Sequence, residues 1–216
     1  MSLKVSVIPV TAYQQNCSIL YCENTGKAAL IDPGGEVDIL LEYIASINAR
    51  LEKIFLTHGH IDHVGAASEI SARAGVPIIG PHIADKFWLD DLPQYAQMMG
   101  FPPSPALTPD QWLEDGDKIQ FGEIVLDVIH CPGHTPGHVV FYHPESALAF
   151  VGDVLFQGSV GRTDFPGGDH DQLVESITKK LWPLGDAVEF IPGHGPMSSF
   201  GEERKYNPFV ADTQFG

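Results

Sequence analysis

Short apolar segments alternate with connections rich in glycine and proline along the whole chain. Segments that alternate with a period of two, or form short apolar runs, predict β-strands. We expect these strands at residues 3–9, 16–22, 27–32, 51–57, 76–80, 123–130, 137–142, 147–152 and 187–191. Hairpin-like strands on either side of helices indicate the α/β class. We therefore expect two packed sheets with helices on both outer faces, a four-layer αββα sandwich.

Three stretches have the apolar period of an amphipathic helix instead. Their stripes predict helices over residues 37–44, 62–74 and 169–181. Gly75 follows the second stripe and suits a left-handed C-cap, and Asp169 suits the N-cap of the third.

Residues 81–113 differ in character from the rest of the chain. They contain six prolines and several large side chains, among them Trp88, Tyr95, Met98 and Met99. Two interpretations are open: an inserted helical layer packed on the core, or a lid over an active site. Methionines and aromatic residues are usually core, so the layer is favoured.

The composition is that of one soluble domain of ordinary size. The chain has 216 residues, 44 % of them hydrophobic, and we expect a single domain over residues 1–216. No uncharged apolar run reaches the roughly 18 residues of a membrane span, and the N-terminus has no export signal. We therefore expect a cytoplasmic protein without a membrane partner, and a monomer.

Charge and cysteine content narrow the function further. With 28 acidic and 12 basic residues the net charge is −16, which repels a phosphate backbone, so we expect no nucleic-acid partner. The three cysteines, Cys17, Cys22 and Cys131, include no C-x-x-C pair. They predict buried thiols rather than disulfides.

A dense cluster of metal-binding side chains follows the apolar strand that ends near Thr57. It reads Thr57-His58-Gly59-His60-Ile61-Asp62-His63. His58 and His60 leave extended backbone on the same side, while Asp62 and His63 open the next helix. So many like groups are costly together unless a cation organises them. The cluster can hold two ions, with His58 and His60 on one and Asp62 and His63 on the other.

Three more candidate ligands occur at similar positions later in the chain. His134, Asp153 and His194 each follow an apolar strand and one or two glycine or proline residues. The alternative, unrelated polar residues at strand ends, is disfavoured because separate placements share one pattern. Imidazole and carboxylate suit Zn²⁺, Fe or Mn²⁺. We expect one or two Zn²⁺ ions, with Fe or Mn as alternatives.

These motifs together resemble the metallo-β-lactamase superfamily in order and spacing. They are Thr57-His58-x-His60-x-Asp62-His63, Gly133-His134-Thr135-x-Gly137-His138, Gly152-Asp153, Gly193-His194-Gly195 and, earlier, Ile31-Asp32-Pro33-Gly34-Gly35. Asp153 stands where many true β-lactamases carry a cysteine, and residues 203–209 resemble a glyoxalase II stretch. The chain is most similar to the glyoxalase II group (hydroxyacylglutathione hydrolases), in a short bacterial form.

The resemblance implies a site at the edge of the two sheets. Its two metal positions would be filled by His58, His60 and His134 on one side and by Asp62, His63 and His194 on the other, with Asp153 bridging. His138 is expected beside the ligands or in the core rather than as a ligand.

The resemblance also implies a reaction, the hydrolysis of a thioester such as S-lactoylglutathione to a 2-hydroxy acid and glutathione. Two ions would lower the pKa of a shared water, and the resulting hydroxide would attack the thioester carbonyl. Asp62 and Asp153 are the expected catalytic residues, because they could orient this nucleophile as well as bind metal. The expected partner is thus a small-molecule glutathione thioester.

Basic residues are the candidates for binding this anionic substrate. In glyoxalase II a basic residue at the place of Arg162 binds a carboxylate of glutathione; the alternative is an ion pair of Arg162 with Asp164 or Asp169. The chain ends soon after residues 203–209, so we expect a truncated C-terminal helical part, in which Arg204 and Lys205 could also bind substrate.

Three rival functions are also compatible with these motifs. A mononuclear iron persulfide dioxygenase could keep most of the motif. A lactonase, a lactamase or another hydrolase could use the same fold. A metal-binding module without turnover is the third, which the complete ligand set disfavours.

Overall fold

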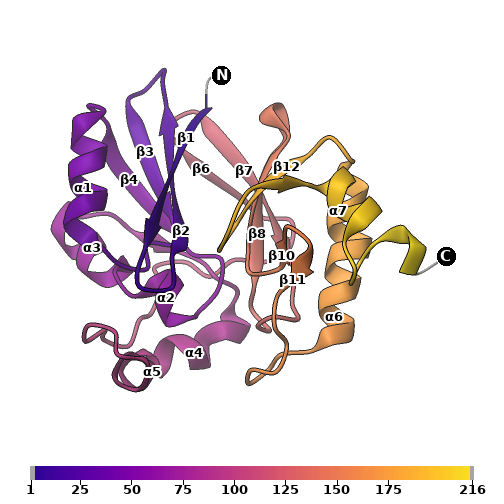
Figure 1. Ribbon diagram of the computed structural model, residues 1–216. Coiled ribbons are helices and arrows are strands. Elements are labelled where there is room, and N and C mark those ends of the chain that lie inside the picture. Colours follow the sequence, from indigo (N-terminus) through magenta and orange to yellow (C-terminus); the bar gives the residue numbers. More distant parts are fainter. Residues whose placement is uncertain (1–2, 215–216) are drawn as a thin grey trace.

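In the computed structural model, which describes residues 3–214, two mixed sheets pack face to face (Figure 1). The first sheet has five strands in the order β1-β2-β3-β4-β5. They are β1 (Leu3–Val10), β2 (Gln15–Cys22), β3 (Lys27–Ile31), β4 (Arg50–Phe55) and β5 (Ile78–Ile79). The first three are antiparallel, whereas β4 and β5 continue the sheet in parallel through helical crossovers.

The second sheet has six strands in the order β13-β12-β9-β8-β7-β6. They are β6 (Lys118–Phe121), β7 (Ile124–His130), β8 (Val139–His143), β9 (Leu148–Gly152), β12 (Glu189–Pro192) and β13 (Ser198–Ser199). Only β9 and β12 pair in parallel; the other pairs are antiparallel. A small hairpin, β10 (Leu155–Phe156) and β11 (Ser159–Val160), follows β9.

Helices cover both outer faces of the sheet pair. The α-helices are α1 (Val37–Ser46), α2 (Ile61–Val64), α3 (Ala67–Ala74), α4 (Lys86–Asp90), α5 (Leu92–Met99), α6 (His170–Glu175) and α7 (Phe200–Tyr206). Helices α1 and α3 lie on the first sheet and α6 and α7 on the second (Figure 1). Short 3-10 helices occur at Ile83–Asp85, Pro144–Ser146, Trp182–Leu184 and Asp212–Gln214.

Three apolar clusters separate the four layers. The cluster between the sheets includes Phe55 from the first sheet and Phe141 from the second, with ring centroids 5.8 Å apart. A second cluster joins the first sheet to α1 and α3 through residues such as Leu40, and a third joins the second sheet to α6 through residues such as Leu173. The predicted αββα sandwich is confirmed, because each sheet buries one face on the other and one on helices.

The strand predictions are confirmed to within a few residues at each end, and the short strands β6, β10, β11 and β13 were not predicted. The single helix over 62–74 is wrong: the structure has α2 and α3, separated at Gly65. A Cβ on Gly65 would lie 2.7 Å from the carbonyl oxygen of Gly34, and the Ala66 N–H donates to the Pro33 carbonyl. The loop that contains Pro33 and Gly34 therefore packs closely against the chain at Gly65, and the helix is interrupted there.

The caps fit their predicted places. Gly75 ends α3 with φ +67°, and the Asp169 carboxylate accepts the backbone N–H of Gln172 at 3.0 Å. The helix that Asp169 begins is not uniform, because after α6 the chain widens into a π-helix over Ser176–Leu181. In residues 81–113, Leu89 of α4 is fully buried in the core beside the first sheet.

No helix in residues 3–214 has the length and apolarity needed to cross a membrane.

Candidate metal centre

The predicted ligands meet at one edge of the two sheets. The turn between β4 and α2 supplies His58 and His60, and α2 itself supplies Asp62 and His63. The second sheet supplies the others from three separate connections, which hold His134, Asp153 and His194. Strands of both sheets end at this edge. Side chains that lie up to 136 positions apart in the sequence, such as His58 and His194, therefore converge there.

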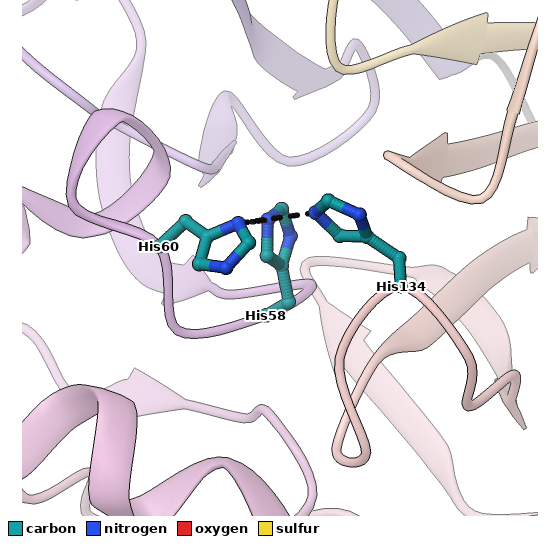
Figure 2. Close-up of side chains that lie close together, drawn as sticks. All are labelled: His58, His60 and His134. Carbon is teal, nitrogen blue, oxygen red and sulfur yellow. Dashed lines mark hydrogen bonds between the residues drawn. The ribbon is translucent and has the colours of Figure 1, made fainter. Parts of the chain in front are cut away.

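The first donor group consists of His58, His60 and His134. Nδ1 of His60 lies 3.1 Å from Nε2 of His58 and 3.0 Å from Nε2 of His134. Figure 2 shows the three rings turned toward one another, two from the same turn and one from the opposite sheet. Three ring nitrogens around one point are a typical facial ligand set for a transition metal.

The second donor group consists of Asp62, His63 and His194. A carboxylate oxygen of Asp62 lies 3.2 Å from Nε2 of His194 and 3.8 Å from Nε2 of His63. Asp153 stands between the two groups: one of its oxygens is 3.3 Å from Nε2 of His63, and the other is 3.7 Å from Nε2 of both His134 and His194. The carboxylate of Asp153 is therefore placed to contact a cation in either group.

Backbone carbonyls fix which nitrogen of two rings faces the centre. Nδ1–H of His134 donates to the carbonyl of Arg162 at 2.7 Å, and Nδ1–H of His194 donates to the carbonyl of Tyr13 at 3.1 Å. Because a carbonyl only accepts, each ring carries its proton on Nδ1. The Nε2 lone pair of each ring therefore points into the centre.

Asp32 orients two further histidines in the same way. Its carboxylate accepts the Thr57 hydroxyl at 2.5 Å and Nδ1–H of His63 at 2.9 Å. Because the Thr57 hydroxyl donates its hydrogen to Asp32, its oxygen accepts Nδ1–H of His58 at 3.0 Å. A carboxylate behind a histidine is the usual support of a metal ligand, since it fixes the tautomer and increases the basicity of the ring.

Buried polar atoms without partners show that the donors fit a cation. Nε2 of His63 and Oδ1 of Asp153 are buried and make no hydrogen bond among residues 3–214. Buried polar atoms are normally satisfied, and neutral imidazole together with carboxylate is the donor chemistry of Zn²⁺, Fe or Mn²⁺. A divalent ion in each donor group would satisfy both atoms, and the residues present fit such ions.

The two donor groups differ in electrostatics. Burial and the neighbouring histidines lower the pKa of His58 well below its usual value, and burial and the charge of His134 lower the pKa of His60 to about 3. Both rings are thus neutral near pH 7, the form that binds metal. Burial would also lower the pKa of His63, but the charges of Asp153 and Asp62 outweigh it and raise that pKa. The second group therefore concentrates negative charge that attracts a cation.

Two residues outside the ligand set hold the ligand loops. The buried Asp85, in the 3-10 turn Ile83–Asp85, accepts the Gly137 N–H at 2.6 Å and the Thr135 hydroxyl at 2.8 Å. Nε2 of His138 accepts the backbone N–H of Asp153 at 3.0 Å, and the His138 ring stacks on His58 with centroids 4.7 Å apart. His138 is thus a support of the ligands rather than one of them.

A cavity of about 670 Å³ opens over both donor groups. His60, Asp62, His134, Asp153 and His194 form its metal-binding floor. Its other lining side chains are mainly aromatic or apolar and include Tyr13, Trp88, Tyr95, Met98, Phe156 and Phe165. The donors are thus open to a small molecule through this cavity, which is the arrangement of a catalytic rather than a closed structural metal site.

The predicted substrate-binding residues separate into two places. Arg162 lines the cavity, and its guanidinium makes two hydrogen bonds to Asp164, at 2.9 and 2.8 Å. Arg204 lies in another groove, beside α6, where it pairs with Asp186 and Asp212. Lys205 lies over the ring of its neighbour Tyr206. Arg204 and Lys205 therefore do not line the cavity over the donors, and their contacts hold them on α7.

Several residues that shape the site have no role among the predictions from the sequence. Asp32 had a usable signal, since it follows the apolar strand β3 just as the ligands follow theirs. Asp85 and Trp88 had none, because they reach the centre only through tertiary contacts of a segment without a strand.

Comparison with known proteins identifies the family of this chain. The model of the metallo-beta-lactamase superfamily matches residues 10–194. The chain belongs to this superfamily, and its centre is that of a metal-binding hydrolase.

Individual relatives cover almost the whole chain. It is 45 % identical over 209 residues to the hydroxyacylglutathione hydrolase GloC of Haemophilus influenzae, covering 96 % of this chain and 98 % of that protein. It is 34 % identical to the probable metallo-hydrolase YqgX of Bacillus subtilis, covering 94 % and 95 %. Among solved structures it is similar to the B3 metallo-beta-lactamase BLEG-1 (TM-score 0.88, 35 % identity, 96 % and 99 % covered) and to TTHA1623 in a di-iron-bound form (TM-score 0.86, 37 % identity, 95 % and 100 % covered).

Proposed function

We propose that this chain is a thioester hydrolase of the glyoxalase II type, which cleaves a thioester such as S-lactoylglutathione to a 2-hydroxy acid and glutathione. The observation that carries the proposal is the position of Asp153 between two donor groups at the floor of a substrate-sized cavity. The 45 % identity to a protein named hydroxyacylglutathione hydrolase supports the choice of substrate.

The residues of the site have two roles, metal binding and orientation of the attacking water. His58, His60 and His134 would hold one ion and Asp62, His63 and His194 the other, with Zn²⁺ as the proposed metal. Bound ions supply a nucleophile near neutral pH by lowering the pKa of water. Asp62 and Asp153 then accept hydrogen bonds from the attacking water and set its direction toward the thioester carbonyl.

The side chains that line the cavity also contribute to the reaction. The apolar lining keeps bulk water from the thioester, so the attack comes from the floor, where the two carboxylates lie. The thiolate that leaves is a weak base and needs no strong general acid.

The decisive experiment pairs elemental analysis of the purified protein with an assay of thiol release from S-lactoylglutathione. We expect zinc in the protein, and hydrolysis that a chelator abolishes and added Zn²⁺ restores. Oxygen uptake with glutathione persulfide but no thiol release would instead make the protein a persulfide dioxygenase. Hydrolysis of a β-lactam or a lactone, with no activity on the thioester, would also overturn the proposal.

A further inference from the structure

One side of the cavity is an apolar wall, which we define as Trp88, Tyr95, Met98 and Met99 of α4 and α5. The indole of Trp88 stands edge-on to the ring of His60, with ring centroids 4.4 Å apart, and Tyr95 follows at 4.8 Å from Trp88. The wall therefore begins at the first donor group and leads outward to the two methionines.

The wall is accessible to a ligand. Met98 is 71 % exposed and Met99 39 %, although both belong to a helix that buries other residues in the core. A methionine that only filled the core would be covered. Flexible thioethers at the rim of an aromatic surface adapt to apolar groups of different shape.

The positive charge of the cavity lies beside this wall rather than within it, because Phe165, which stands edge-on to Trp88, carries Arg162 on its ring. Among the described residues that line the cavity, Arg162 is the only arginine or lysine, and it lies over the ring of Phe165 at 4.6 Å. A peptidic thiol carries carboxylates, so its place is beside Arg162. The acyl group of the thioester is left to the apolar wall.

We infer that the apolar wall selects the acyl group, and that the preferred substrates carry an aromatic or other large apolar acyl group. The inference rests on the thioester hydrolysis proposed above and specifies its substrate class. The methyl of a lactoyl group is too small to cover the Trp88 and Tyr95 rings. A phenyl group in its place removes much more apolar surface from water and can stack on these rings.

Two thioesters of one thiol test the inference. S-mandeloylglutathione differs from S-lactoylglutathione only by phenyl in place of methyl, so the thiol end and the reacting carbonyl stay the same. We expect kcat/KM to be about tenfold higher for the mandeloyl ester, the size of effect that an apolar pocket gives for a modest change in a side group.

Surface variants assign the preference to the wall. In the double variant Met98→Ser, Met99→Ser we expect the mandeloyl preference to shrink to about twofold or less, because kcat/KM falls more for S-mandeloylglutathione than for S-lactoylglutathione. Both side chains are exposed, so the fold tolerates the change. Ile39→Ser is the matched control, since Ile39 is 53 % exposed on α1 and does not line this cavity.

Binding without turnover separates this inference from the proposed function. S-benzylglutathione and S-ethylglutathione are thioethers that cannot be hydrolysed, so titration calorimetry measures their binding alone. We expect the protein to bind the benzyl compound about tenfold more tightly, because its phenyl group contacts the apolar wall. Equal binding of the two, or equal kcat/KM for the two thioesters, would overturn the inference even if the enzyme is active. Loss of hydrolysis for every thioester with the binding preference intact would overturn the proposed function and support the wall.

Discussion

One carboxylate oxygen of Asp85 accepts the backbone N–H of Gly59 at 2.9 Å, between the two histidines of the first ligand turn. The other oxygen accepts from the loop that carries the third histidine of the same donor group. The segment that contains Asp85 supplies no ligand, yet it joins the two ligand loops. Gly59 permits this contact, because a Cβ there would lie 2.6 Å from Cβ of Trp88.

Replacing Asp85 should therefore weaken both the fold and the metal centre. Asp85→Ala leaves two buried backbone N–H groups and a hydroxyl without an acceptor, and we expect the free energy of unfolding to fall by about 3 kcal/mol. Metal affinity should fall about tenfold, because ligand supports act through the orientation of the loops. Asp90→Asn, which removes an exposed ion pair with Lys86 on the same segment, is the control. Unchanged metal affinity in Asp85→Ala would show that the loops hold their places without it.

The same carboxylate should make stability depend on pH. Burial raises the pKa of Asp85 to about 6, although three hydrogen bonds to the carboxylate oppose the shift. The unfolded chain, with an ordinary pKa near 4, releases this proton first, so the folded state loses relative stability as the pH rises from about 4 to about 6. We expect the stability of the metal-free wild type relative to Asp85→Asn to fall by about 2 kcal/mol between pH 4 and pH 7. Denaturation in urea at both pH values measures the difference, and a flat difference would refute the prediction.

The positions of the metal donors could be predicted because they follow apolar strands within a few residues. Strand ends of a layered α/β protein meet at common edges, so the local pattern around His134, Asp153 and His194 carried three-dimensional information. The pattern of strands and helices gave the mixed α/β class, and the four-layer order was an expectation that the structure confirms. The sandwich and the convergence of donors were thus accessible from the sequence.

Contacts made by irregular segments could not be predicted. Asp85 lies in a 3-10 turn 26 positions from Gly59, and no periodicity links the two. Arg204 is a second example: its charge suits an anionic substrate, but the structure pairs it with Asp186 and Asp212 in another groove. A charge in the sequence does not reveal its partner, because the partner is chosen by tertiary packing.

The donor set itself is tested by single replacements. His60→Ala removes a ligand of the first group, and Asp153→Ala removes the carboxylate between the groups. We expect each to lower kcat for a thioester by about a hundredfold or more and to reduce the bound metal. His170→Ala is the matched control, because His170 is exposed at the start of α6. Near-normal kcat in either variant would count against the centre as the site of reaction.

We expect the cysteines of the folded protein not to react with thiol reagents. Cys17, Cys22 and Cys131 are all 0 % exposed, and burial raises the pKa of Cys131 to about 12. A thiol reagent attacks the exposed thiolate, so at pH 8 we expect no labelling of the native protein within minutes and three labelled thiols in denaturant. Fast labelling of any thiol without denaturant would show that its side chain becomes accessible. The same assay reports whether the variants above are folded.

Arg162 is the basic residue of the cavity that we expect to bind a carboxylate of the substrate. Its two hydrogen bonds to Asp164 join exposed side chains (68 % and 66 %), and such pairs break easily in water. Arg162 can therefore leave Asp164 for a substrate carboxylate. For a glutathione thioester we expect Arg162→Ala to raise KM about tenfold with kcat nearly unchanged, the pattern of lost uniform binding. Asp164→Asn should lower KM about twofold, since it frees the guanidinium. An unchanged KM in both variants would remove Arg162 from the substrate site, and a lower kcat at constant KM would place its effect in the transition state instead.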